Sequence, residues 1–187
     1  MVKLTRIYTR TGDQGQTGLG DGTRVDKQSP RVTAFGSVDE ANSALGIARL
    51  HADADLDAML ARIQNDLFDL GADLCTPEVE EPRYPPLRIV GSQVQWLEQA
   101  IDTLNADLPS LRSFVLPGGT ALAAYLHLGR TVARRAERDI CVLLEQEAVN
   151  PLTLHYINRL SDFLFVAARY ANRDAGGDVL WEPGKNR

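Results

Sequence analysis

Apolar residues recur at alternating steps of three and four along five segments of the chain, the spacing of helices that each bury one stripe. The segments run from Ala34 to Ala48, Leu56 to Leu74, Val94 to Leu108, Leu122 to Leu143 and, after Pro151, from Leu154 to Ala168. No two runs of alternating β-branched residues are joined by a hairpin turn, so we expect no substantial sheet. The pattern predicts an all-α fold.

Two stretches interrupt the helical pattern. Between Cys75 and Ile89 the chain carries Pro77, Pro82, Pro85 and Pro86, whose rings remove backbone amides and restrict torsions, so we expect a loop there. Beyond Asn172 the chain has no apolar periodicity and should fray or pack as an irregular arm. We therefore predict one domain of 187 residues: a glycine-rich irregular segment (1–30), a helical bundle (31–172) and a tail (173–187).

Composition narrows the class of protein. A formal net charge of -5 argues against a general nucleic-acid binder, so any basic site must be local. No stretch approaches the roughly 18 consecutive apolar residues of a membrane span, and the first residues lead into no apolar run. We expect a protein of the cytoplasm that binds neither nucleic acid nor membrane.

Cysteine and histidine give no sign of a metal held by the protein. Cys75 and Cys141 lack partners at ligand spacing, so we expect two buried thiols rather than a disulfide or a zinc site. No histidine completes a Glu-x-x-His pair, which disfavours a di-iron carboxylate bundle. Trp96 and Trp181 are expected to be core or packing residues.

Five glycines fall within eleven residues near the start of the chain, at positions 12, 15, 18, 20 and 22. Such a run excludes a helix and lets successive backbone amides point at one anion, so it is typical of a phosphate cradle. Hydroxyl and cationic side chains stand among the glycines: Thr9, Thr11, Thr17, Arg10, Arg24 and Lys27. The alternative is a flexible linker, because the segment lacks the Gly-Lys-Ser/Thr ending of a Walker loop.

The fourth predicted helix carries a row of charges along one flank. Arg130, Arg134, Glu137 and Arg138 are spaced at i, i+4, i+7 and i+8, and Arg135 adds a further cation. Guanidinium groups bind phosphate oxygens as a fork, at about 1.5–3 kcal/mol for each charge-assisted bond. The row predicts a polyphosphate site, with an ordinary solvated helix face as the alternative. The carboxylate in the row would orient the arginines, reach a sugar hydroxyl or form a plain helix salt bridge.

Polar residues also lie beside the buried stripes of the first and fifth helices. Taken singly each suits a cap or an inter-helix contact, and together they indicate a polar seam between helices or between subunits. They are Asp39, Glu40 and Asn42 on the first helix, and Asn158, Arg159 and Asp162 on the fifth.

Five separated motifs occur in one order along the chain. They are Thr-Arg-Thr-Gly-Asp-Gln-Gly-Gln-Thr at 9–17, Phe-Gly-Ser-Val-Asp-Glu-Ala-Asn at 35–42, Phe-Val-Leu-Pro-Gly-Gly-Thr at 114–120, Arg-Arg-Ala-Glu-Arg at 134–138 and Asn-Arg-Leu-Ser-Asp at 158–162. In this combination the chain closely resembles the PduO-type ATP:cob(I)alamin adenosyltransferases between residues 5 and 172. The proline-rich loop and the tail are the unmatched parts.

The resemblance implies a five-helix bundle of ferritin-like up-down arrangement, assembled as a homotrimer with active sites between subunits. ATP would lie between the amino-terminal loop of one subunit and the fourth helix of its neighbour. Asp39 would pair with Arg130 across that interface, and Phe114 would press on the corrin face, with a buried anchor for its loop as the alternative. The residues implied to hold the nucleotide are Thr9, Arg10, Thr11, Gly12, Thr17, Gly18 and Lys27 in the loop, and Arg134, Arg135, Ala136, Glu137, Arg138 and Asn158 on the helices.

The chemistry implied by the resemblance needs cations rather than a side-chain nucleophile. Reduced cobalt attacks the ribose 5′ carbon of ATP and expels triphosphate, so Arg134, Arg130 and Mg²⁺ would stabilise the charge on the leaving group. The implied substrates are ATP and cobalamin, and the implied partners are a reductase and a cobalamin-dependent enzyme. The competing hypothesis is a helical sensor or scaffold that binds ATP without turning it over.

Overall fold

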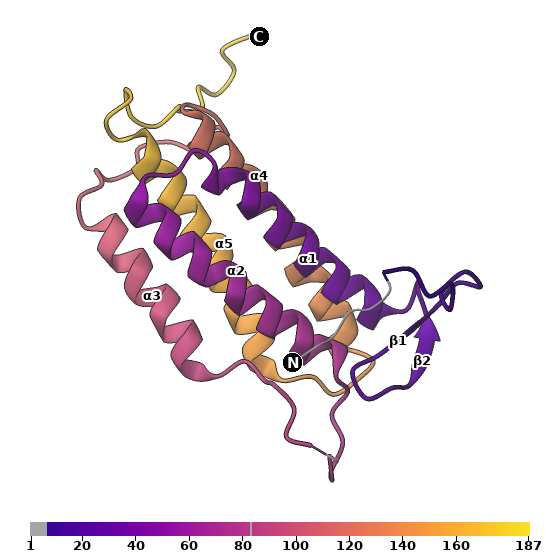
Figure 1. The fold of residues 1–187 in the computed structure, drawn as a ribbon. Coiled ribbons are helices and arrows are strands. Elements are labelled where there is room, and N and C mark those ends of the chain that lie inside the picture. Colours follow the sequence, from indigo (N-terminus) through magenta and orange to yellow (C-terminus); the bar gives the residue numbers. More distant parts are fainter. Residues whose placement is uncertain (1–6, 83) are drawn as a thin grey trace.

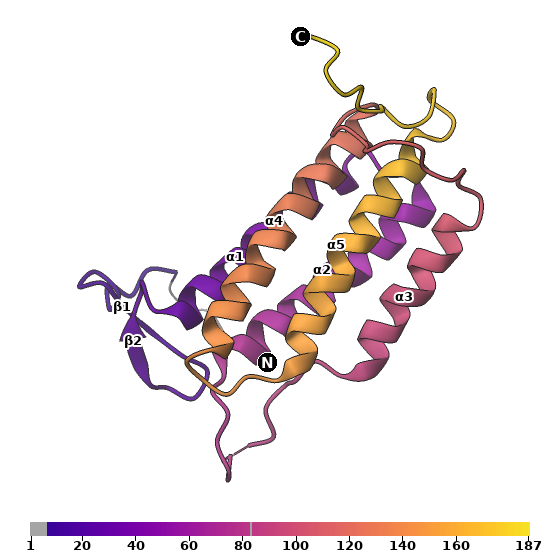
Figure 2. The ribbon, with the colours of Figure 1, turned by 180° about the vertical axis from the view of Figure 1, so that it is seen from behind.

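The computed structural model describes residues 7–82 and 84–187, and in them five helices form a bundle (Figures 1 and 2). The helices are α1 (Pro30–Arg49), α2 (Ala54–Cys75), α3 (Gly91–Asn105), α4 (Ala121–Leu144) and α5 (Pro151–Asn172). Successive helices run in opposite directions, with α4 packed between α1 and α5, and α3 against α5. The predicted all-α, up-down bundle is confirmed.

Side-chain caps explain where four of the helices begin. Each cap accepts a hydrogen bond from a backbone amide of the first turn that has no partner within the helix. Prolines at the first helical positions of α1 and α5 add a preset torsion. The caps are Ser29 for α1, Asp53 for α2, Thr120 for α4 and Asn150 for α5.

The predicted apolar stripes meet in one core. Tyr156 and Phe163 of α5 are its largest fully buried side chains, and the Tyr156 hydroxyl donates to Asp66 Oδ2 on α2 at 3.1 Å. The α4 residue Gly129 lets that helix approach α1, because a Cβ there would lie 3.2 Å from Leu45. Packing at this distance fixes the face that α4 turns outward.

A small hairpin stands inside the glycine-rich segment, where we predicted irregular chain. Strands β1 (Gln16–Gly18) and β2 (Arg24–Asp26) pair antiparallel, and Gly22 turns between them with φ of 90°. The Gly20 amide donates to the Cys75 carbonyl at the end of α2 at 2.8 Å, and a Cβ at Gly20 would collide with Thr76. The segment is therefore folded against the bundle and is not a free linker.

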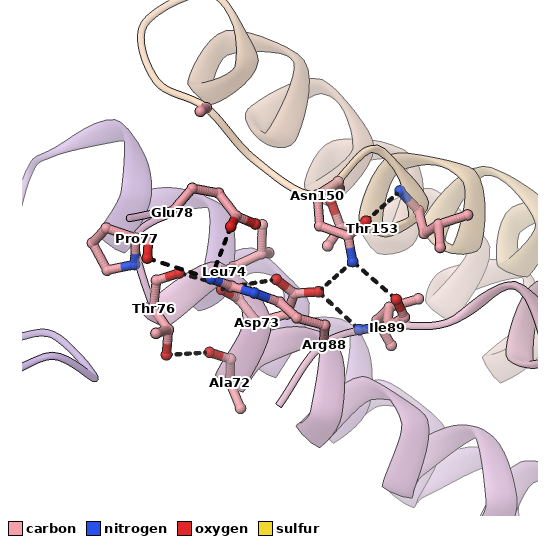
Figure 3. Close-up of polar contacts among 12 residues, drawn as sticks. Ala72, Asp73, Leu74, Thr76, Pro77, Glu78, Arg88, Ile89, Asn150 and Thr153 are labelled. Atoms are coloured by element: carbon pink, nitrogen blue, oxygen red, sulfur yellow. Dashed lines mark hydrogen bonds and ion pairs between the residues drawn. The ribbon is translucent and has the colours of Figure 1, made fainter. Parts of the chain in front are cut away.

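The last turn of α2 receives its hydrogen-bond donors from other parts of the chain (Figure 3). Arg88 Nη1 donates to the Asp73 carbonyl at 2.8 Å and to its carboxylate at 2.7 Å, and Arg31 Nη1 donates to the Leu74 carbonyl at 2.5 Å. Asn150 Nδ2 donates to the second Asp73 carboxylate oxygen at 2.8 Å. Because α2 has no basic residue in its last turn, these two arginines supply the cations that a helix C-terminus favours.

The tail packs as an arm on the segment before α4. The Trp181 amide donates to the Phe114 carbonyl at 2.8 Å, and the Leu116 amide donates to the Val179 carbonyl at 2.7 Å. Arg169 and Asp178 form an ion pair at 2.9 Å that ties the arm to α5. Residues 178–181 of the tail therefore pack as an arm, which is one of the two alternatives for this segment.

The two cysteines and the two tryptophans lie at different depths in the structure. The prediction of two buried thiols is wrong, because Cys141 lies on the exposed side of α4 and Cys75 is half-buried at the end of α2. Trp96 packs against the core under Arg62, whereas Trp181 is 43% exposed and packs on the loop before α4. Among the described residues, no helix is long and apolar enough to cross a membrane.

Candidate functional site

Hydroxyl groups and a strained backbone mark the start of the glycine-rich segment. Thr9 Oγ1 and Thr11 Oγ1 lie 2.9 Å apart, so the two hydroxyls are hydrogen-bonded to each other. Between them Arg10 adopts φ of 61°, a left-handed conformation that costs a non-glycine residue about 1–3 kcal/mol. Strain of this kind, with alternating backbone handedness, is typical of loops whose amides converge on an anion.

Lys27 brings its ammonium group against the same loop. Its backbone amide donates to the Gly15 carbonyl at 2.8 Å, and Nζ lies 3.1 Å from the position that a Cβ at Gly12 would occupy. A side chain at Gly12 would therefore push the cation aside. Thr17 and Gly18 lie in β1, where they stand opposite Val25 and Arg24 of β2.

The charged residues of α4 differ in exposure: Arg134, Arg135 and Arg138 are exposed, whereas Arg130 and Glu137 are half-buried. Arg134 and Arg138 point to solvent, with Arg138 Nη1 donating to the Arg134 carbonyl at 3.0 Å, whereas Arg135 forms an ion pair with Glu40 on α1. Ala136, expected in the nucleotide site, is 0% exposed, because its methyl group belongs to the core stripe. Of the predicted row, Arg134 and Arg138 are thus the exposed pair, and Arg135, the further cation, turns to α1.

Glu137 lies on the side of α4 that faces α5. Its carboxylate accepts from Asn158 Nδ2 at 2.8 Å, and Arg159 in turn donates to Asn158 Oδ1 at 2.8 Å. In the described chain Glu137 forms no ion pair, so the helix salt bridge considered from the sequence is absent there. The structure instead brings Glu137 together with Asn158, two residues expected in one site.

A hollow of about 320 Å³ opens between α4 and α5 beside the row. Arg130 lines it, and the buried Nε atom of that residue has no hydrogen-bond partner among the described residues. Burial lowers the pKa of Arg130, and the neighbouring Arg134 lowers it further. A buried charged donor without a partner indicates that an acceptor belongs there. Ser161, Asp162, Phe165 and Val166 of α5 complete the wall.

Asp39 lies elsewhere, in a groove of about 400 Å³ between α1 and α2. The groove also exposes the ring of Phe68, which is 72% accessible. Among the described residues no ion pair joins Asp39 to Arg130, and no hydrogen bond or ion pair joins the glycine-rich segment to the α4 row. One chain therefore carries the predicted parts of the site on separate surfaces.

Phe114 is 77% exposed, so the alternative of a buried loop anchor is wrong. Its ring packs at 5.9 Å from that of Trp181, and Ser113 Oγ donates to the Trp181 carbonyl at 2.6 Å. The arm thus holds an aromatic surface open to solvent. Sequence reasoning missed this use of Trp181, because a tail without periodicity gives no sign of what it packs against.

His127 is a second feature that the sequence did not single out. The ring is 1% exposed, neither nitrogen has a partner among the described residues, and Phe165 meets it edge-on at 6.2 Å. Burial lowers its pKa, as does Arg130 to a smaller extent, while Asp178 opposes them. The sequence shows only that this histidine stands beside the predicted apolar stripe of α4, which does not reveal that its ring is buried.

The described residues contain no group of three or more His, Cys, Asp or Glu side chains that could hold a metal ion. A Mg²⁺ ion prefers several oxygen ligands and keeps much of its water, so here it would have to be held largely by a ligand's phosphates. The protein provides cations and backbone amides rather than a carboxylate cage.

A glycine-rich hairpin with clustered hydroxyls, an exposed guanidinium pair and an open aromatic surface on a helical bundle are typical of a nucleotide-binding protein of the all-α class. A family model described as cobalamin adenosyltransferase matches residues 7–171. The chain belongs to this family, and its similarity to PduO-type proteins confirms the resemblance drawn from the motifs.

Curated relatives match over nearly their whole length. A corrinoid adenosyltransferase of Mycobacterium tuberculosis is 54% identical over 190 residues, covering 100% of this chain and 97% of the relative. A cobalamin adenosyltransferase of Cupriavidus metallidurans is 49% identical over 183 residues, covering 96% of each.

Solved structures agree with the fold. A variant of the PduO-type ATP:corrinoid adenosyltransferase of Lactobacillus reuteri, complexed with cobalamin and ATP, superposes with a TM-score of 0.89 at 41% identity, covering 95% of this chain and 99% of that one. Another variant of that enzyme, complexed with ATP, has a TM-score of 0.87 at 42% identity, covering 95% and 100%.

Proposed function

We propose that the glycine-rich segment and the α4 row hold ATP while its adenosyl group passes to a reduced corrinoid. The chain is an ATP:cob(I)alamin adenosyltransferase, which makes adenosylcobalamin and triphosphate. The observation that carries our assignment of the site is the exposed pair Arg134 and Arg138, in reach of a ligand on a protein of net charge -5. The carboxylate of the predicted row, Glu137, accepts a hydrogen bond from Asn158 and pairs with neither arginine.

The reaction consists of one displacement at carbon. The cobalt electron pair forms a bond to the ribose C5′ atom while the C5′–O bond breaks, and that bonding pair leaves with the triphosphate. No proton needs to be removed, so no general base is required. Arg134 and Arg138 stabilise charge that builds on the leaving oxygen, which lowers the barrier to the displacement. Thr9, Thr11 and Lys27 hold the far end of the triphosphate.

Phe114 provides the surface for the corrin. An exposed ring supported from behind by Trp181 covers one face of a flat macrocycle and keeps water from the cobalt. Loss of a lower axial ligand on that face eases reduction to the nucleophilic state.

Two copies complete one site. Asp39 and the unpartnered Arg130 lie on separate surfaces of one chain, and a neighbour's Asp39 supplies the acceptor that Arg130 Nε lacks. The pairing joins one protomer's α1/α2 groove to the next protomer's α4/α5 hollow. Because these surfaces differ, the contact is head-to-tail. A head-to-tail contact whose rotation closes gives a ring, and a ring of three is the homotrimer that the resemblance implies.

Several finer points of the assignment stay predictions. The absence of a carboxylate cage in the described residues favours Mg²⁺ that arrives with ATP as part of the substrate. The resemblance also implies a reductase that supplies cob(I)alamin and an enzyme that receives the product. We propose that all three work in the cytoplasm.

One assay separates this function from a protein that senses ATP without turning it over. Purified protein is mixed with ATP and chemically reduced cob(I)alamin, and the light-sensitive adenosylated product is followed by absorbance. We expect product and triphosphate in equal amounts. Bound ATP without product under strict reduction would favour the sensor.

A further inference from the structure

Arg24 lies at the start of β2, opposite Gly18, and its guanidinium is turned onto the glycine-rich segment. Nη2 donates to the Thr11 carbonyl at 2.7 Å and to the Gln16 carbonyl at 3.3 Å. These two carbonyls stand at either end of the loop that precedes β1. A single guanidinium nitrogen thus ties both ends of the loop to the hairpin.

Other carbonyls of the loop are also occupied. The Gly12 carbonyl accepts from the Gly15 amide at 3.2 Å, and the Gly15 carbonyl accepts from the Lys27 amide at 2.8 Å. A carbonyl oxygen carries partial negative charge and repels a phosphate, so a loop that binds triphosphate must turn its carbonyls away. The strongest of the contacts that do so here is the one made by Arg24.

The orientation of one peptide plane follows from this contact. The described chain has no cis peptide bond, and in a trans peptide the C=O and N–H point in opposite directions. Since the Thr11 carbonyl points at Arg24, the Gly12 N–H points away from it. That amide has no acceptor within residues 7–82 and 84–187. Gly12 directly follows Thr11, whose hydroxyl oxygen lies 2.9 Å from that of Thr9.

We propose that Arg24 is a positioning residue of the triphosphate site, which fixes the Thr11–Gly12 peptide so that the Gly12 amide is presented to a phosphate oxygen. The inference deepens the proposed function and rests on it. Arg24 acts through the backbone: its Nη2 is already engaged by two carbonyls, so it is not a spare cation for the phosphates. This differs from the sequence-based interpretation, in which Arg24 supplied opposing charge.

The test compares Arg24→Met with wild type by titrating inorganic triphosphate into protein labelled with ¹⁵N-glycine. The chain has 15 glycines, so the Gly12 amide signal can be assigned and followed. In wild type we expect a large downfield shift of that signal on binding. In Arg24→Met we expect roughly tenfold to hundredfold weaker binding and, at saturation, a Gly12 signal that no longer makes this shift.

A matched variant, Arg187→Met, removes one surface cation from the opposite end of the bundle (Figure 1) and should bind as wild type does. The Gly18 and Gly22 signals report whether the hairpin is intact in Arg24→Met. If they are lost, the same measurement is made on Arg24→Lys, which keeps the charge but whose ammonium ends one bond short of the Nη2 position, and the same criterion applies.

A full Gly12 shift at saturation in the Arg24 variant overturns the inference, because the residue then acts by its charge alone. Wild-type affinity in that variant overturns it as well. Failure of the proposed function looks different: wild type itself would bind no triphosphate and form no adenosylated product.

Discussion

The clamp made by Arg31 gives the sharpest stability prediction. This α1 side chain is 2% exposed, and its Nε and Nη2 donate to Glu147 Oε2 at 2.9 and 2.7 Å while Nη1 donates to the Leu74 carbonyl. It joins the start of α1, the end of α2 and the connection from α4 to α5. Arg31→Met keeps most of the stem volume but removes every donor.

The expected loss of stability comes from the groups that lose their hydrogen-bond partner in Arg31→Met. The Leu74 carbonyl is left buried without its donor, at about 1–3 kcal/mol. Removing one partner of a fully buried ion pair costs about 3–5 kcal/mol, but Glu147 is 43% exposed and water takes over part of that role. We therefore expect the free energy of unfolding to fall by about 3 kcal/mol, a large part of the roughly 5–15 kcal/mol that domains possess.

Urea unfolding, followed by far-ultraviolet circular dichroism at one fixed protein concentration, measures the loss. Arg49→Met is the matched control, since its partners at the other end of α1, Asp57 and Gln64, stay open to water when the half-buried arginine is lost, and it should cost much less. A loss below about 1 kcal/mol in Arg31→Met, or one no greater than the control's, would refute the clamp.

Four further predictions concern the site and its supports. Arg134→Ala should reduce adenosylation at least about a hundredfold and leave the circular dichroism spectrum unchanged, because an exposed cation for the leaving group is lost without core volume; unchanged turnover argues against this site. Phe114→Ala should retain ATP affinity by calorimetry but slow adenosylation, and a large loss of ATP affinity would make the residue structural. His127→Leu should flatten the pH dependence of stability. Burial lowers the pKa of His127 in the folded protein below the ordinary 6.5, so the wild type loses stability as pH falls from about 6.5, because the unfolded chain then binds the extra proton. An equally steep dependence in the variant would assign that loss to other groups. Gly119→Ala should cost about 2 kcal/mol or more in urea unfolding, since φ is 97° and a Cβ would collide with Asn172, whereas Gly91→Ala, with open space, should be near neutral.

The bundle itself could be predicted because its information is local. Periodic leucines and alanines define each buried stripe, and Pro30 and Pro151 mark where two helices begin. The exposed arginines of α4 followed from the same periodicity, since a residue one or two positions off the stripe faces outward. What Arg135 does could not be predicted, because its long side chain reaches an acidic partner, Glu40, on a neighbouring helix.

The short segments could not be predicted, since their structure depends on distant contacts. The hairpin is held by Gly20 on Cys75, and nothing in a run of glycines names that carbonyl. The arm pairs with the segment around Phe114 through backbone groups, which every sequence has. From the sequence we predicted that Arg24 faces phosphates, because the sequence shows a cation but does not show the carbonyls to which that cation donates.

The last turn of α2 is completed by residues that lie before and after it in the chain, which affects when this turn folds during synthesis. Its terminal carbonyls receive donors from Gly20, Arg31 and Arg88, which arrive from both sides of the helix in sequence. A nascent chain released only as far as α2 lacks the last of these donors, so this turn stays frayed until residue 88 has emerged and docked. Its amides should then be among those that exchange with deuterium only when the whole protein opens.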